Sequence, residues 1–181
     1  MKNLSAQAKG YILITILIGL GLIAWMLAEL DWGNYGLFLL AVLGAVAQTL
    51  KVEGPNDKTN YSIAWFVYGF AFVQFGPTAA LLVIVIAHLV EWIWHKYPWY
   101  IQSFNIGAHV ISVFLAGLTF EWISGETRVL DLNGAIGLVT ANLIFIVANH
   151  FLVGIVVTLA RGQSFAESGI FGFLTLFLDF T

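Results

Sequence analysis

The feature that most limits what this chain can fold into is a succession of long apolar segments that carry almost no charge. The first of them, residues 11–30, contains one charged residue, Glu29. About 20 apolar residues make a helix long enough to cross the ~30 Å hydrocarbon core of a bilayer. The segment is too long for the core of a signal peptide, and no small-residue cleavage site follows it. We therefore expect it to be retained as a membrane-spanning helix.

The composition of the whole chain agrees with this expectation. Of its 181 residues, 60% are hydrophobic and 9% are charged, whereas about a quarter are charged in a soluble domain. So few charges cannot cover a water-soluble globule, and so much apolar character excludes a disordered chain. The chain has no cysteine, which excludes disulfides, thiolate catalysis and cysteine-bound metals. Its net charge of −3 offers no cationic surplus to a nucleic acid.

Polar breaks divide the chain into successive apolar segments. We predict an all-α fold, a polytopic helical membrane bundle that forms a single transmembrane domain over residues 1–181. Six complete spans are expected, at residues 11–30, 35–50, 63–75, 78–95, 101–123 and 134–160. The third is short for a span, and Pro77 suits the first turn of the fourth helix because its missing N–H costs nothing there.

The last apolar segment, residues 169–181, is too short for an ordinary span and contains Asp179. We interpret it as a truncated seventh span, which would make the chain the N-terminal fragment of a longer protein. The alternative is an interfacial or re-entrant tail.

The cations give an orientation. With the N-terminus in the cytoplasm and the spans alternating, Arg128 is the one cation outside, and the other six are inside: Lys2, Lys9, Lys51, Lys58, Lys96 and Arg161. This is the positive-inside pattern of a multi-pass membrane protein.

Polar side chains within the expected spans are candidates for function, because they are costly there. His88, Glu91 and His95 share one helix face, and His109 and His150 lie at similar depths on the next two helices. Imidazoles from three helices can form a metal, haem or proton site, with His88, His109 and His150 as the metal ligands. A network of interhelical hydrogen bonds or unrelated positions are the alternatives. The candidate ligand cavity comprises Tyr68, Gln74, His88, Glu91, Asn105, His109, Asn149 and His150.

Gln48, Gln74, Gln102 and Asn105 are further polar candidates, near the ends of the helices. Glycines within the spans allow helices to approach closely, among them Gly19, Gly21, Gly44, Gly107 and Gly137. No phosphate-binding loop, nucleophile elbow or HExxH motif is present, so the chain is not expected to be an enzyme, and no cofactor can be named.

Two stretches carry a resemblance to a known family. Residues 50–65 read Leu-Lys-Val-Glu-Gly-Pro-Asn-Asp-Lys-Thr-Asn-Tyr-Ser-Ile-Ala-Trp, and residues 75–82 read Phe-Gly-Pro-Thr-Ala-Ala-Leu-Leu. A polar hairpin, a serine-led short helix, a Phe-Gly-Pro turn and an alanine-rich helix resemble the MASE-like multi-span sensor domains of bacteria. These domains precede HD-GYP phosphodiesterase or GGDEF diguanylate cyclase domains.

The resemblance covers about residues 37–173 and implies a membrane input module for cyclic-di-GMP signalling. It implies the bacterial inner membrane, a small-molecule ligand and a homodimer, whereas the cytoplasmic N-terminus is predicted from the cations. The HD, GYP and GGDEF motifs are absent from this sequence. Two alternatives remain: a substrate-specific subunit like those of energy-coupling-factor transporters, and an intramembrane histidine-ligated metal or haem protein.

Overall fold

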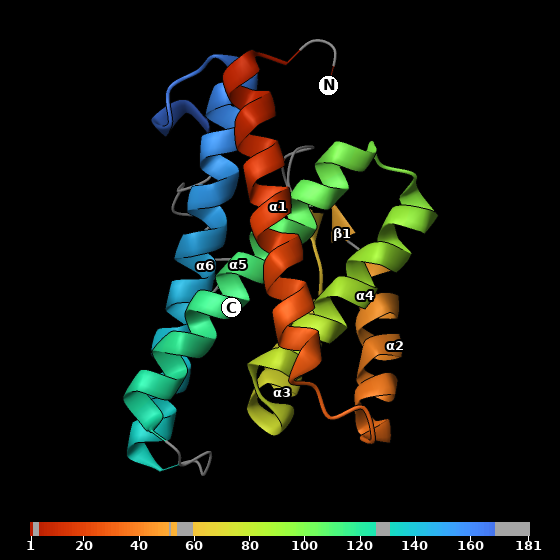
Figure 1. The fold of residues 1–181 in the computed structure, drawn as a ribbon, viewed down its shortest axis with the longest axis vertical. Helices are drawn as coiled ribbons and strands as arrows, with labels where there is room; N and C mark the ends of the chain where they lie inside the picture. The colour runs from red at the N-terminus through yellow and green to blue at the C-terminus, as the bar shows by residue number, and fades with distance from the viewer. Residues whose placement is uncertain (2–3, 51, 54–59, 126–130, 169–181) are drawn as a thin grey trace. The chain divides into compact units, whose positions relative to one another are not determined.

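The computed structural model describes residues 1, 4–50, 52–53, 60–125 and 131–168, which are mostly helical (Figure 1). The elements are α1 (Ala6–Ala28), α2 (Tyr35–Thr49), β1 (Val52–Glu53), β2 (Asn60–Tyr61), α3 (Ala64–Phe75), α4 (Pro77–His95), α5 (Trp99–Ser124), α6 (Leu132–Arg161) and the short 3₁₀ helix η1 (Ala166–Ser168). The predicted all-α class is confirmed for this part of the chain, and the two-residue strands form only a small hairpin.

Four of the six predicted spans have the length of a membrane helix. Helices α1, α4, α5 and α6 are long and apolar enough to cross a bilayer. Helix α2 has 15 residues and α3 has 12, which gives about 22 and 18 Å against a hydrocarbon core of ~30 Å. The six complete spans are therefore not confirmed, because polar and turn residues leave too few residues for α2 and α3. The expected seventh span lies outside the described residues.

The ends of the helices follow local backbone chemistry. Asn34 Oδ1 accepts the Gly36 N–H at 3.0 Å before α2, and Asp131 Oδ1 accepts the Gly134 N–H at 2.7 Å at the start of α6. Pro77 is the first residue of α4, as predicted. It follows Gly76, whose φ of 89° suits a residue without a side chain and separates α3 from α4.

The polar stretch between α2 and α3 forms a small antiparallel hairpin. Val52 pairs with Tyr61, and Glu53 pairs with Asn60. The predicted turn at residues 54–57 lies outside the described residues. Just after the hairpin, the Ser62 hydroxyl donates to the Ala47 carbonyl at 2.9 Å and accepts the Ala64 N–H at 3.1 Å. The end of α2 and the start of α3 are therefore joined at one end of the helix pair.

The contacts divide the chain into two compact units. Unit 1 consists of Met1–Leu20 and Ser103–Thr181, and unit 2 consists of Gly21–Gln102. In unit 2, helices α2, α3 and α4 pack on one another, and α4 contributes Leu81, Val83 and Ile84, each at most 1% exposed. In unit 1, Val110 of α5 and Ile146 of α6 are fully buried.

Glycines bring the backbones of α1 and α5 together in unit 1. A Cβ added at Gly19 would lie 2.6 Å from Gly107 Cα, and one added at Gly107 would lie 2.8 Å from the Thr15 carbonyl oxygen. The predicted packing role of these two glycines is confirmed. The prediction for Gly21 is not confirmed, because no described residue lies within 4 Å of a Cβ added there.

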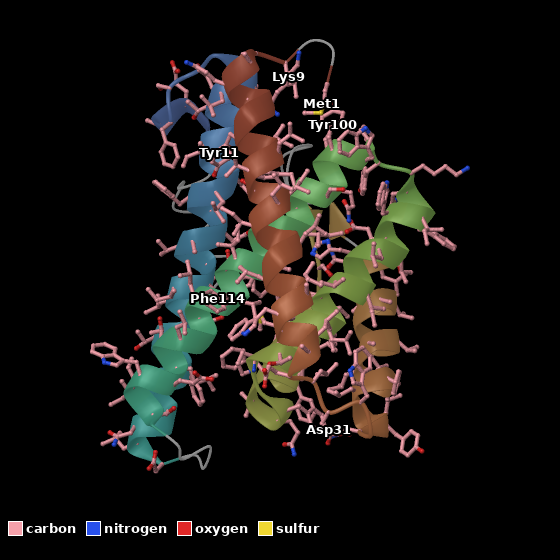
Figure 2. The ribbon with its side chains drawn as sticks, viewed as in Figure 1. Met1, Lys9, Tyr11, Asp31, Tyr100 and Phe114 are labelled. Carbon is pink, nitrogen blue, oxygen red and sulfur yellow. The ribbon has the colours of Figure 1, made fainter. Side chains whose placement is uncertain are left out.

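Hydrogen bonds join the beginning of α1 to the end of α6 within unit 1. The Tyr11 hydroxyl donates to the Leu152 carbonyl, and the Ser5 hydroxyl donates to the Leu159 carbonyl, both at 3.2 Å. Figure 2 shows the side chains that project from the helices. Several of the large apolar ones are exposed, such as Leu17 of α1, which is 67% exposed. Exposed apolar faces of this kind suit a hydrocarbon environment.

Candidate functional site

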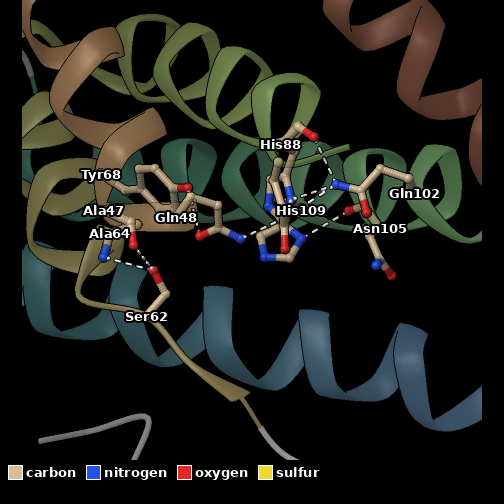
Figure 3. A network of polar contacts seen from close by, with 10 residues as sticks. Ala47, Gln48, Ser62, Ala64, Tyr68, His88, Gln102, Asn105 and His109 are labelled. Atoms are coloured by element: carbon tan, nitrogen blue, oxygen red, sulfur yellow. Dashed lines mark hydrogen bonds and ion pairs between the residues drawn. The ribbon is translucent and has the colours of Figure 1, made fainter. Parts of the chain in front are cut away.

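Five polar side chains are buried together in unit 2. They are Gln48 of α2, Tyr68 of α3, His88 and Glu91 of α4, and Gln102 of α5, and we call them the Glu91 cluster. Each is at most 5% exposed. Figure 3 shows the labelled members pointing toward one another from the surrounding helices. A buried polar group is costly unless it is hydrogen-bonded, so such a concentration in an apolar chain marks a candidate site.

Helix direction explains why these residues meet. Gln48 lies in the last turn of α2, Tyr68 in the second turn of α3, and Gln102 in the first turn of α5. Glu91 lies four residues before His95, the end of α4, which is about 6 Å along the helix axis. The cluster therefore lies one to two turns from the end of unit 2 where α2 joins α3 and α4 leads into α5.

One oxygen atom is the centre of the cluster. Glu91 Oε2 accepts hydrogen bonds from Gln48 Nε2 at 3.0 Å and from Gln102 Nε2 at 3.2 Å. His88 Nδ1 lies 3.1 Å from the same oxygen. Side chains of three helices, α2, α4 and α5, thus converge on one carboxylate oxygen, and hydrogen bonds to a charged acceptor are the stronger ones.

Further bonds fix the orientation of both carboxamides. Gln102 Nε2 also donates to the His88 carbonyl oxygen at 2.8 Å. The Tyr68 hydroxyl donates to Gln48 Oε1 at 3.1 Å, which adds α3 to the network. Because Gln48 accepts at its oxygen and donates at its nitrogen, rotating its amide would break both bonds.

The structure brings together three of the predicted cavity residues, Tyr68, His88 and Glu91. Gln74 is exposed on α3 and does not join them. Gln48 and Gln102 were predicted as polar candidates near helix ends but were not assigned to the cavity. The antiparallel order of the helices was the signal that could have placed them there, since it brings those ends to the level of Glu91.

The other predicted cavity residues lie in unit 1. His109 Nδ1 donates to the Asn105 carbonyl and His150 Nδ1 to the Ile146 carbonyl, each at 2.9 Å and within one helix. The His109 ring also packs on Phe145, with ring centroids 5.9 Å apart. Asn149 Oδ1 is buried and has no hydrogen-bond partner among the described residues.

The predicted metal ligands are divided between the units. His88 belongs to unit 2, whereas His109 and His150 belong to unit 1. Among the described residues, no three His, Cys, Asp or Glu side chains are grouped as a metal ion requires. Around Glu91, the arrangement is instead an interhelical hydrogen-bond network.

Unit 1 contains a separate apolar groove on α5 and α6, of about 620 Å³. Its lining includes Leu115 and Trp122 of α5, and Val147 and Phe151 of α6. The groove shares no residue with the predicted cavity. Its one hydroxyl, that of Thr119, already donates to the Leu115 carbonyl at 2.9 Å, so the groove offers little to a polar ligand.

Comparison with known proteins identifies no relative of this chain: no family model, no curated protein and no solved structure matches it. The features of the chain that bear on its function are the Glu91 cluster and the apolar helices.

Proposed function

We propose that this chain is the membrane input module of a bacterial signalling protein whose cytoplasmic domain makes or degrades cyclic-di-GMP. The observation that carries the proposal is the buried Glu91 carboxylate, which side chains of α2, α4 and α5 bind at one end of unit 2. The resemblance of residues 50–65 and 75–82 to MASE-like sensor domains supports the same function.

The cluster suits a switch because its bonds depend on the positions of four helices. A shift of α2 or α5 would separate a carboxamide from Glu91, and the buried carboxylate would then lose a hydrogen-bond donor. Leaving a buried hydrogen-bonding group without its partner costs about 1–3 kcal/mol, and more when the group is charged. Intermediate positions are therefore unfavourable, and the bundle prefers a few discrete arrangements between which a signal can select.

The proposed orientation places the Glu91 cluster near the cytoplasmic side of the membrane. With the N-terminus in the cytoplasm, the end of unit 2 that holds the cluster faces the cytoplasm of a bacterial inner membrane. A change in helix packing there lies close to the side on which cyclic-di-GMP is made and degraded. A homodimer would suit an output domain that acts as a dimer, and a small molecule bound among the helices would supply the signal.

The natural reading frame beyond codon 181 tests this proposal. We expect it to continue through the membrane and into a phosphodiesterase or cyclase domain, and the encoded protein to change cellular cyclic-di-GMP when it is expressed. A frame that ends at Thr181 would contradict the proposal. Copurification with ATPase subunits would then support a transporter subunit, and a visible absorbance band in the purified protein would support a haem protein.

A further inference from the structure

His88 and Glu91 form a buried contact between an imidazole and a carboxylate within α4. The two residues are three positions apart on α4 and are 3% and 1% exposed. His88 Nδ1 lies 3.1 Å from Glu91 Oε2. Two lone pairs would repel each other at this distance, so a hydrogen atom must lie between the nitrogen and the oxygen.

The neighbours of Glu91 Oε2 indicate which atom carries that hydrogen. Gln48 and Gln102 both donate to this oxygen, which is the environment of an ionised carboxylate. Gln102 Nε2 also donates to the His88 carbonyl at 2.8 Å, and it lies 3.4 Å from His88 Nδ1, the longest of its three contacts. The arrangement therefore favours a carboxylate at Glu91 and a hydrogen on Nδ1 of His88, whose ring then holds its remaining lone pair on Nε2.

The surrounding titratable groups are phenols and imidazoles. Tyr68 faces the cluster from α3, and α2 and α5 contribute neutral carboxamides. Tyr97 lies between α4 and α5, and its pKa is raised by burial and by the negative charge of Glu91. His109 of α5 and His150 of α6 are the further titratable groups that the sequence predicts at a similar depth.

We propose that His88 and Glu91 form a proton-binding site. A proton binds to His88 Nε2, and the Nδ1–H bond to Glu91 Oε2 is kept. The pair changes from a neutral imidazole with a carboxylate to an imidazolium with a carboxylate, so its net charge rises from −1 to zero. Release of the same proton restores the first state.

Proton occupancy changes the charge that the two carboxamides bind. Their hydrogen bonds to Oε2 weaken when the positive charge of the imidazolium neutralises the carboxylate. The hydrogen bond from the Tyr68 hydroxyl to Gln48 Oε1 changes with them. The hydrogen bonds that hold α2, α3 and α5 therefore depend on the protonation state of the pair. The step from there to signalling rests on the proposed function, whereas proton binding itself does not.

Nitrogen NMR of the full chain in lipid nanodiscs tests the site. The chain has four histidines, so ring labelling gives few signals, which H88Q and H95Q assign. His95 is exposed and stacks on Tyr97 with ring centroids 5.4 Å apart, and it serves as the reference on the same helix. We expect the neutral His88 ring to carry its hydrogen on Nδ1 and to take up a second proton.

A matched pair of variants tests the coupling. Glu91→Gln should change the proton concentration at which the His88 signal is half-way between its two states by about tenfold. Glu121→Gln, at an exposed position of α5, should leave the midpoint unchanged. A neutral His88 ring with its hydrogen on Nε2, or the same midpoint in E91Q and wild type, would overturn the proposal.

The same measurement remains decisive if E91Q fails to fold. The tautomer of His88 is read from the wild-type chain, and Glu91→Asp then replaces E91Q by lengthening the contact without removing the acid. Neither measurement involves an output domain. A negative result would therefore leave the proposed function standing, and a failure of the proposed function would leave the proton site standing.

Discussion

At the scale of single residues, Gln102 is the position where the cluster can be tested with least change in size. Gln102→Leu removes the hydrogen bonds to Glu91 Oε2 and to the His88 carbonyl and leaves both acceptors buried. We expect a loss of about 1–3 kcal/mol in the free energy of unfolding, the usual cost of a buried group left without its partner. Chemical unfolding of the purified protein in detergent measures it.

Gln74→Leu is the matched control, because Gln74 is exposed on α3. Its effect should stay within about 0.5 kcal/mol, as for most surface substitutions. Equal stabilities of the Q102L and Q74L proteins would show that the hydrogen bonds of Gln102 do not hold the bundle together.

At the scale of elements, the crossing of α1 and α5 depends on the absence of a side chain. Gly107→Ala would place Cβ 2.8 Å from the Thr15 carbonyl oxygen, a backbone atom that cannot move without its helix. We expect a loss of about 1–3 kcal/mol, as for other overpacked sites. Gly10→Ala on α1 would meet none of the described residues within 4 Å and should instead stabilise the helix by up to about 1 kcal/mol.

Thermal unfolding under identical conditions distinguishes the two variants, because the melting temperature should fall for Gly107→Ala and rise for Gly10→Ala. If Gly107→Ala proved as stable as Gly10→Ala, the helices would not touch through their backbones at this point.

The segment after α6 offers a test by pH. The N–H and the hydroxyl of Ser164 each donate to Glu167 Oε2 at 2.8 Å, and these bonds lower the pKa of Glu167. A carboxyl whose pKa is lower in the folded state stabilises that state above its ordinary pKa and loses this contribution as the pH falls through the lowered value.

We expect carbon NMR of the Glu167 carboxyl to show a midpoint below the ordinary value for glutamate. Ser164→Ala removes the hydroxyl and should raise that midpoint. An unchanged midpoint in S164A would contradict the assigned role of the serine hydroxyl.

At the scale of the whole molecule, the proposed orientation can be tested with single cysteines, because the chain has none of its own. Asp31 follows α1 and Lys96 follows α4, and both are exposed. Helices α2 and α3 are joined by a hairpin, so Asp31 and Lys96 fall on opposite sides whether that pair crosses the membrane or only enters it.

We expect an impermeant maleimide to label the D31C protein in intact cells and the K96C protein only after permeabilisation. The reverse pattern would place the N-terminus outside, and labelling of both in intact cells would contradict an odd number of crossings between them.

Much of this organisation could be predicted from the sequence, because apolar length and turn residues are local signals. The six described helices, Pro77 at the start of α4 and the packing role of Gly107 were all predicted. The pairing of Gln48 and Gln102 with Glu91 was not, because it depends on which helix ends pack together.

The measurement that tests the role of Glu91 most directly is cellular cyclic-di-GMP with the complete protein of the natural reading frame. Glu91→Gln, compared with Glu121→Gln at equal membrane abundance, removes the buried charge while keeping the side-chain size. We expect E91Q to change cyclic-di-GMP by about fivefold or more, the range of ordinary coupling between sites, and E121Q to match wild type. Equal cyclic-di-GMP in wild type, E91Q and E121Q would contradict a signalling role for the Glu91 cluster.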